Sequence, residues 1–287
     1  MNYEDIQKAI EAAANQSPDM SQAAAGGGGY TPPNKGKCVA ILVGYVETGR
    51  HLKEYQGNKS YPRRAQFIFE LQGGVNPVET NDQGEKVVKR ITVHTTMPEP
   101  GKQPSEKSGY YKLFAAMNYD GQAKHPAQCV GKHFLVDVQH EEWEKNGQKN
   151  ISATLGSAQT RFFIERPVVL KGDVLAGDQQ EVPIPCPTRV SEVRLFLWDF
   201  PSKPMWDALY IDGEYPEQKD EKTGKVTRAA RSKNVFQLKI KEAKDWPESP
   251  MAELLAAGGD VDLPEELAGD PAAAGGAADE DPLAGMV

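Results

Sequence analysis

Cationic and aromatic side chains alternate along the segment between residues 50 and 64. The phosphates of a single nucleic-acid strand attract Lys and Arg, and its unpaired bases stack on flat aromatic rings, so this mixture suits a strand-binding arm. The alternative is a solvated hairpin with ordinary surface charges. The candidate contacts in this arm are Arg50, Lys53, Tyr55, Lys59, Tyr61, Arg63 and Arg64.

Other parts of the chain offer the same chemistry. Tyr55 and Tyr61 are the strongest stacking candidates because they lie in a polar arm, whereas Tyr45 and Phe69 lie in apolar runs where a place in the core is an equal alternative. Stacking contributes about 1–3 kcal/mol per base, so a few rings and cations can hold a strand with little sequence preference. The further candidates are Lys89, Arg90, Lys107, Tyr110, Tyr111 and Lys112.

Short runs of β-branched and aromatic residues on either side of the arm predict strands, and Asn146-Gly147 predicts a hairpin turn. Ser108 is a suitable N-cap for a short helix. The expected elements are strands at 39–43, 65–71 and 87–96, a helix at 108–117, and strands at 134–140 and 151–155. This is the element order of an OB-fold, a five-stranded barrel with one helix between strands 3 and 4 that binds oligonucleotides.

We therefore predict a mainly β protein with four parts. Residues 1–34 form a flexible N-terminal arm, 35–160 an OB-fold-like nucleic-acid-binding core, and 161–257 an α/β extension packed on that core. In the extension we expect strands at 193–198 and 235–240, with Trp198 and Trp206 as core anchors rather than stacking platforms. Residues 258–287 have too few large apolar side chains for a core and are expected to be disordered.

The charge is divided unevenly along the chain. The pI is about 5.3 and the net charge −8, yet residues 35–161 contain 18 Lys and Arg against 13 Asp and Glu. Residues 242–287 contain 12 acids and one Lys. The acidic end has three interpretations: a solubilising segment, a docking peptide for partners, or a polyanion that competes with DNA for the basic groove. The candidate partner-binding residues are Asp279, Glu280, Asp281, Pro282 and Leu283.

No catalytic motif is apparent in the sequence. It contains no phosphate-binding P-loop, no GxSxG, no HExxH and no paired-cysteine zinc pattern, so we expect a non-enzymatic protein without a metal or cofactor. Cys38, Cys129 and Cys186 are widely spaced, which fits a reducing cytosol. No leader or long apolar run suggests export or a membrane.

The pattern from Lys37 to Ser157, together with the acidic Gly/Ala/Pro-rich tail, resembles the single-stranded DNA-binding proteins of tailed bacteriophages and, more distantly, of bacteria. The resemblance implies a protein that coats and protects single-stranded DNA during replication and recombination in the host cytoplasm. It also implies a tail that recruits polymerase, helicase or primase. This tail ends Met286-Val287, whereas tails of that family commonly end in Phe. A homo-oligomer is left open.

Three rival functions use the same sequence features. They are a recombination mediator or protein-interaction module, a metal-dependent nuclease with its site in residues 161–246, and a phage structural β-barrel. Binding of oligonucleotides by the purified protein, and their survival in Mg²⁺ or Mn²⁺, separate these alternatives.

Overall fold

The computed structural model describes residues 31–145, 148–156, 162–172, 179–219, 224 and 226–258. Most of the expected N-terminal arm, the Asn146-Gly147 turn and the acidic tail lie outside these residues. The five candidate docking residues of the tail, 279–283, lie outside them as well.

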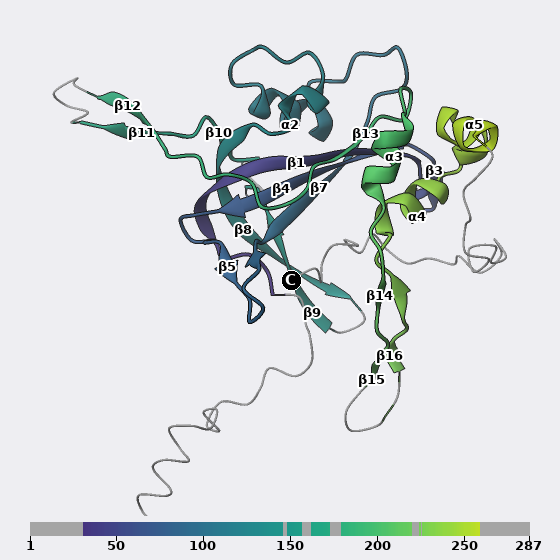
Figure 1. The fold of residues 1–287 in the computed structure, drawn as a ribbon. Helices are drawn as coiled ribbons and strands as arrows, with labels where there is room; N and C mark the ends of the chain where they lie inside the picture. Colours follow the sequence, from purple (N-terminus) through teal and green to yellow (C-terminus); the bar gives the residue numbers. More distant parts are fainter. Residues whose placement is uncertain are drawn as a thin grey trace, which may run out of the picture.

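Short strands dominate the chain, and most helices lie in its second half (Figure 1). The strands are β1 (Gly36–Arg50), β2 (Lys53–Tyr55), β3 (Asn58–Ser60), β4 (Arg63–Gln72), β5 (Glu79–Thr80), β6 (Lys86–Val87), β7 (Arg90–Thr96), β8 (His133–Lys145), β9 (Gln148–Thr154), β10 (Ile164–Glu165), β11 (Val168–Lys171), β12 (Gln180–Pro183), β13 (Arg194–Phe196), β14 (Glu214–Tyr215), β15 (Gln218–Lys219), β16 (Val226–Arg228) and β17 (Arg231–Ser232). The helices are α2 (Gly109–Met117), α3 (Lys203–Leu209), α4 (Val235–Lys241) and α5 (Pro250–Ala257), with 3-10 turns at Pro126–Cys129 and Trp246–Glu248.

The long strand β1 lies at the centre of the main sheet. Along one edge it pairs antiparallel with β4, from Val39 opposite Gln72 to Arg50 opposite Arg63. Its other edge is shared, because β8 pairs antiparallel with the first part of β1 and β13 pairs parallel with residues 44–46. The extension thus contributes a strand to the same sheet as the first half of the chain.

The sheet is open, which corrects the prediction of an OB-fold-like five-stranded barrel. Its order is β10-β8-β1-β4-β7, and among the described residues no ladder joins β7 to β9 or β10. The reason lies in β8, whose first part, 133–138, pairs with β1, whereas β9 pairs with its second part, 139–145. The β8–β9 hairpin therefore projects past the end of β1 and forms no ladder with β7.

The predicted order of three strands, a helix and two further strands is confirmed, but the predicted strand at 235–240 is wrong. Ser108 caps α2 as expected, since its hydroxyl accepts a hydrogen bond from the Tyr111 N–H at 3.1 Å. Residues 235–241 form helix α4, in which Phe236 and Ile240 are four residues apart and both buried. Six residues are too few to separate a period of 2 from one of 3.6, and packing against β1 selects the helix.

Two apolar cores lie on the two faces of the sheet. On one face Leu42, Tyr45 and Phe67 pack with α2. On the other, Val43 and Val46 pack with residues from α3, α4 and α5, which Figure 1 shows gathered at one end of the molecule. A register shift between Leu42 and Gly44 changes the alternation, so that Val43 and Tyr45 face opposite cores.

Trp198 and Trp206 are core anchors, as predicted. They are 5% and 3% exposed and belong to the core that the extension forms with β1. The Trp206 ring stacks on that of Trp246, with centroids 5.3 Å apart. Trp198 lies against Gly49, where an added Cβ atom would be only 2.3 Å from Cζ3 of the indole.

Replacing Gly49 with Ala is expected to lower the free energy of unfolding by about 2–4 kcal/mol. Gly49 has φ +82°, a conformation that costs a non-glycine residue about 1 kcal/mol or more, and the new methyl group would overlap Trp198. Urea denaturation followed by tryptophan fluorescence measures the loss. Gly57→Ala is the matched control, because Gly57 has φ +76° but no atom within 4 Å of the new Cβ. Equal losses in both variants would show that the Trp198 contact is unimportant.

Candidate nucleic-acid interface

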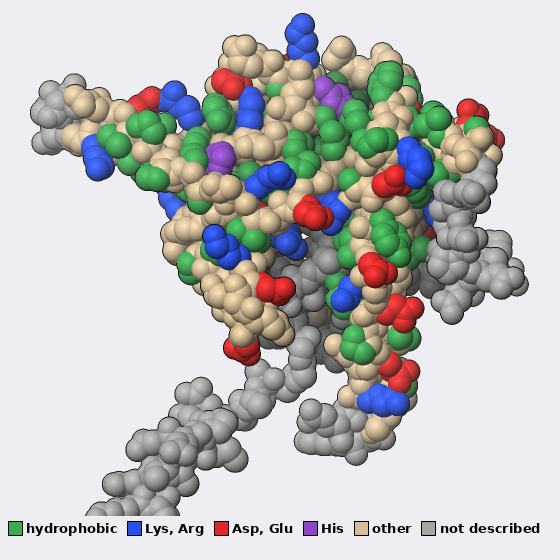
Figure 2. Space-filling model, in the orientation of Figure 1, with side chains coloured by type: hydrophobic (Ala, Val, Ile, Leu, Met, Phe, Trp, Pro, Cys, Tyr) green, Lys and Arg blue, Asp and Glu red, His purple; other side chains and the backbone are tan. Residues whose placement is uncertain are grey.

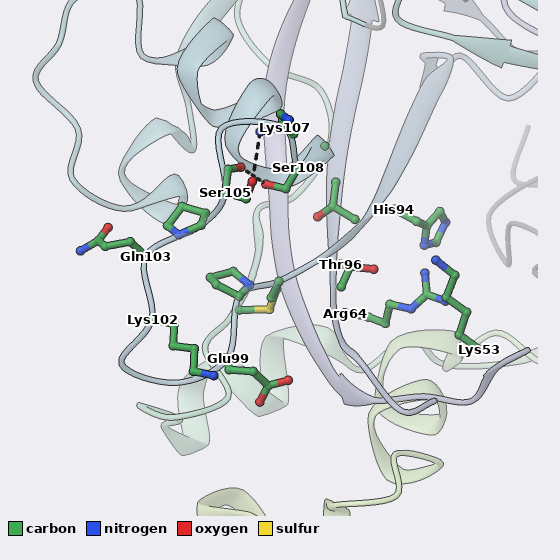
Figure 3. A pocket seen from close by; sticks show the side chains of 15 residues that line it. Lys53, Arg64, His94, Thr96, Glu99, Lys102, Gln103, Ser105, Lys107 and Ser108 are labelled. Atoms are coloured by element: carbon green, nitrogen blue, oxygen red, sulfur yellow. Dashed lines mark hydrogen bonds between the residues drawn. The ribbon is translucent and has the colours of Figure 1, made fainter. Parts of the chain in front are cut away.

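A basic cleft of about 480 Å³ lies between the arm, the outer face of β7 and the loop that precedes α2 (Figure 3). It brings together side chains from three separate segments of the chain. The polar residues that define it are Lys53, Arg64, His94, Thr96, Lys102 and Lys107. The cleft also contains one acid, Glu99, which is bound to Arg50 by an ion pair.

The alternation of β7 places its polar residues in the cleft. Ile91 and Val93 pack into the core below α2, so His94 and Thr96 project from the opposite face. Arg64 of β4 lies opposite Thr96 in the antiparallel register. Figure 3 shows the side chains of Lys53, Arg64 and His94 pointing toward one another. The segment joining β7 to α2 begins with a hydrogen bond from the Met97 N–H to the Arg63 carbonyl and contributes Lys102 and Lys107.

The arm forms a small hairpin of β2 and β3. Residues two apart in a strand share a face, so Tyr55 projects on the same side as Lys53, which lines the cleft. The Tyr55 side chain is among the most exposed large rings of the described residues, at 65%. Lys59 is also exposed but lies 3.9 Å from Glu54. The hairpin therefore presents a cation and a ring side by side, as the sequence predicted.

Two arginines of the arm form ion pairs with acids of other segments. Arg63 is 4% exposed, and its Nη2 donates to Asp199 at 2.8 Å. Arg50 pairs with Glu99 and lies 3.8 Å from Asp245. These contacts use the charge that the sequence assigned to phosphate binding, so the two residues stabilise the fold around the cleft.

Three candidate stacking rings lie in the core. Tyr45 and Phe69 are fully buried, which decides between the two alternatives left by the sequence, and Tyr110 is 6% exposed. The Tyr45 hydroxyl lies 3.1 Å from that of Tyr110. None of these rings offers a face to a base in this conformation. Tyr61 remains 39% exposed, with the Lys244 ammonium 4.2 Å from its ring centroid.

The remaining candidates lie at different distances from the cleft. Lys107 lines it, and Lys112 is exposed on the neighbouring helix α2. Tyr111 lines a second cavity of about 300 Å³, which shares residues of the 97–104 loop with the cleft. Lys89 is half-buried, and Arg90 lies at the opposite end of β7. His94 and Lys102 were missed by the sequence analysis, although the alternation of β7 could have indicated His94.

Comparison with models of known protein families and with curated protein sequences finds no match for this chain. Within the described ranges no three His, Cys, Asp or Glu side chains gather as metal ligands would. No helix in the same ranges has the length and apolar composition needed to cross a membrane.

Behind the second cavity lies a buried carboxylate that connects the two halves of the chain. Glu47 is 4% exposed; its Oε1 accepts a hydrogen bond from the Tyr45 hydroxyl at 2.9 Å and its Oε2 one from the Trp198 N–H at 2.8 Å. Burial raises the pKa of Glu47 above its ordinary 4.5, although both hydrogen bonds and the nearby Arg63 and His125 oppose the shift. Burial therefore disfavours the ionised form of the Glu47 carboxylate, and the hydrogen bonds recover only part of the lost hydration free energy.

Glu47→Gln is expected to change how stability depends on pH. Because the pKa is raised in the folded protein, the folded state binds more protons than the unfolded state between 4.5 and the raised value. Stability of the native protein therefore falls as pH rises through that window, and the contribution of Glu47 is constant above it. Gln can still accept from Trp198 and donate to Tyr45, and it does not titrate.

The measurement is urea denaturation of both proteins at several pH values between about 4 and 7. The stability of Glu47→Gln relative to the native protein should rise as pH increases through this range. A constant difference would contradict the raised pKa.

Proposed function

We propose that this protein binds single-stranded DNA without acting on it chemically. The observation that supports the proposal is the basic cleft, where Lys53, Arg64 and Lys107 converge from different segments beside the exposed ring of Tyr55. A single strand is bound by such a combination, since its backbone follows positive charge and its bases stack on rings. Lys53 and Lys107 have no ion-pair partner among the described residues, so their charge is available to phosphates.

The position of the cleft agrees with the proposal. In an OB-fold, oligonucleotides lie across the face of strands 2 and 3 and the loop between strands 1 and 2. Here β4 and β7 follow β1 along the chain as the second and third strands of the main sheet, and the β2–β3 hairpin lies between β1 and β4. We infer that the open sheet is a variant of this arrangement, with the cleft at the corresponding place.

In this proposal the protein coats and protects exposed strands during replication and recombination, as the resemblance to phage proteins implies. The acidic end would recruit replication proteins through residues 279–283. A recombination-mediator role remains the alternative, and it differs in requiring a protein partner for function on DNA.

Lys53→Ala and Lys107→Ala are each expected to weaken DNA binding and to reduce its salt dependence. For single strands, each lost phosphate contact lowers the slope of log K against log salt by about 0.7. Fluorescence anisotropy with a labelled oligo-dT at several salt concentrations measures both quantities. Lys171→Ala is the control, because this exposed lysine lies on the separate β11–β12 hairpin and has the same charge. Loss of slope in the control equal to that in the cleft variants would contradict the assignment.

Tyr55→Ala should weaken binding to single strands by about 1–3 kcal/mol while leaving the salt slope unchanged, because it removes a stacking ring and no charge. Duplex DNA of the same sequence serves as a comparison, since its bases are not free to stack. Unchanged affinity for the single strand would remove the ring from the site.

Intact oligonucleotide after incubation with Mg²⁺ or Mn²⁺ is expected, because the proposed function is binding without cleavage. Cleavage of the oligonucleotide would favour the nuclease alternative.

Truncation after Ala257 removes the acidic end but keeps the whole of α5. We expect the truncated protein to bind single-stranded DNA as tightly as the full chain or more tightly, since the removed residues are strongly acidic. Pull-down of replication proteins should be lost. Loss of DNA binding itself would show that the two tasks are not separate.

A further inference from the structure

A second basic pocket lies at the other end of β7, where the extension packs against the sheet. It has a volume of about 310 Å³. Its lining cations are Lys86, Arg90 and Arg194, and Glu192 lines it as well. Arg194 is paired with Glu192 at 2.8 Å, so Lys86 and Arg90 are the cations that a ligand would meet. Figure 2 shows Lys and Arg side chains on both sides of the hollow between the β5 hairpin and the β14 hairpin.

The Arg90 guanidinium of this pocket has no ion-pair partner among the described residues. Arg90 is half-buried, and its Nε donates to the Ser191 hydroxyl at 2.8 Å. Burial and the neighbouring Arg194 lower the pKa of Arg90, while Glu70 partly offsets both effects. The Glu70 carboxylate is already used, since it accepts hydrogen bonds from the N–H groups of Val190 and Ser191. An anion in the pocket would therefore supply Arg90 with a partner.

A tyrosine flanked by cations adjoins the pocket. Tyr215 of β14 lies near enough to Arg90 for the two groups to influence each other's pKa. The Arg231 guanidinium lies 5.0 Å from the Tyr215 ring centroid, and the Lys233 ammonium lies 5.6 Å from it. Arg231 and Lys233 have no ion-pair partner in the part of the chain that the structure describes. Cations and a ring therefore occur together here, as they do at the cleft.

The two basic sites lie on the same face of the sheet. Arg90, Thr92, His94 and Thr96 alternate with core residues along β7 and so project to one side. Arg90 belongs to the second pocket and Thr96 to the cleft. At about 3.4 Å per residue they are about 20 Å apart, and the polar Thr92 and His94 lie between them.

We propose that the second pocket is a further anchor for the same single strand, which runs from the basic cleft along the outer face of β7 to Lys86, Arg90 and Tyr215. The inference rests on the proposed function. The cleft would hold one part of the strand, and the extension would hold the next, with phosphates on Lys86, Arg90 and Lys233 and a base against Tyr215. The extension then serves the binding site directly as well as the fold.

The test uses the full chain and oligo-dT of increasing length, from about 4 to about 20 nucleotides, in anisotropy titrations. Native protein should gain affinity in two steps as the strand reaches the second pocket. Tyr215→Leu should weaken binding of the longer oligonucleotides about 5- to 150-fold, the loss of one stacking ring, and leave the shortest unchanged. Lys86→Ala combined with Lys233→Ala should reduce the salt slope by about 1.4 for long strands only.

Each outcome has a distinct meaning. Lys171→Ala again controls for charge, and the urea midpoint of each variant verifies the fold. Weakening confined to long strands supports the anchor. Equal weakening at all lengths, or none, overturns it, while binding of short strands that still depends on Lys53 leaves the proposed function standing. Failure of the native protein to bind any single strand overturns both.

Discussion

The burial of β1 on both faces is the constraint on which the rest of the structure depends. All residues from Cys38 to Thr48 are buried, on both faces of the strand. A strand with two apolar faces needs a covering layer on each. Helix α2 covers one face, and the extension must cover the other, which explains why α3, α4 and α5 pack there instead of forming a core of their own.

The same constraint determines which cations are left for a ligand. At the end of β1 the strand brings Glu47 into the interior, and its neighbours Arg50 and Arg63 are held by acids from distant segments. At β7, the last strand of the order, only one face is covered by the core, and the other face keeps its polar side chains. Basic residues available for binding therefore gather along β7 and its adjoining loops.

Local patterns allowed much of this to be predicted, and contacts between distant residues account for the rest. The Ser108 cap and the apolar runs depend on neighbours in sequence, so α2 and the main strands could be predicted. The internal use of Arg63 could not, because its partner Asp199 is 136 residues away. The open sheet depends on where β9 pairs along β8, which no single segment encodes. The exposure of Tyr55, at 65%, could be predicted because its polar surroundings are visible in the sequence.

An acidic protein can still present a positive site, because charge acts over a limited range. At about 0.1 M salt the Debye length is about 10 Å, so the net charge of −8 matters less to a ligand than the groups that line its site. Among the described residues that line the basic cleft, Glu99 is the one acid, and it is bound to Arg50. Lys53, Lys102 and Lys107 contribute charge of one sign. The fold thus uses Arg50 to neutralise the acid near the cleft and leaves the three lysines facing solvent. The proposed binding of a polyanion depends on that separation rather than on overall composition.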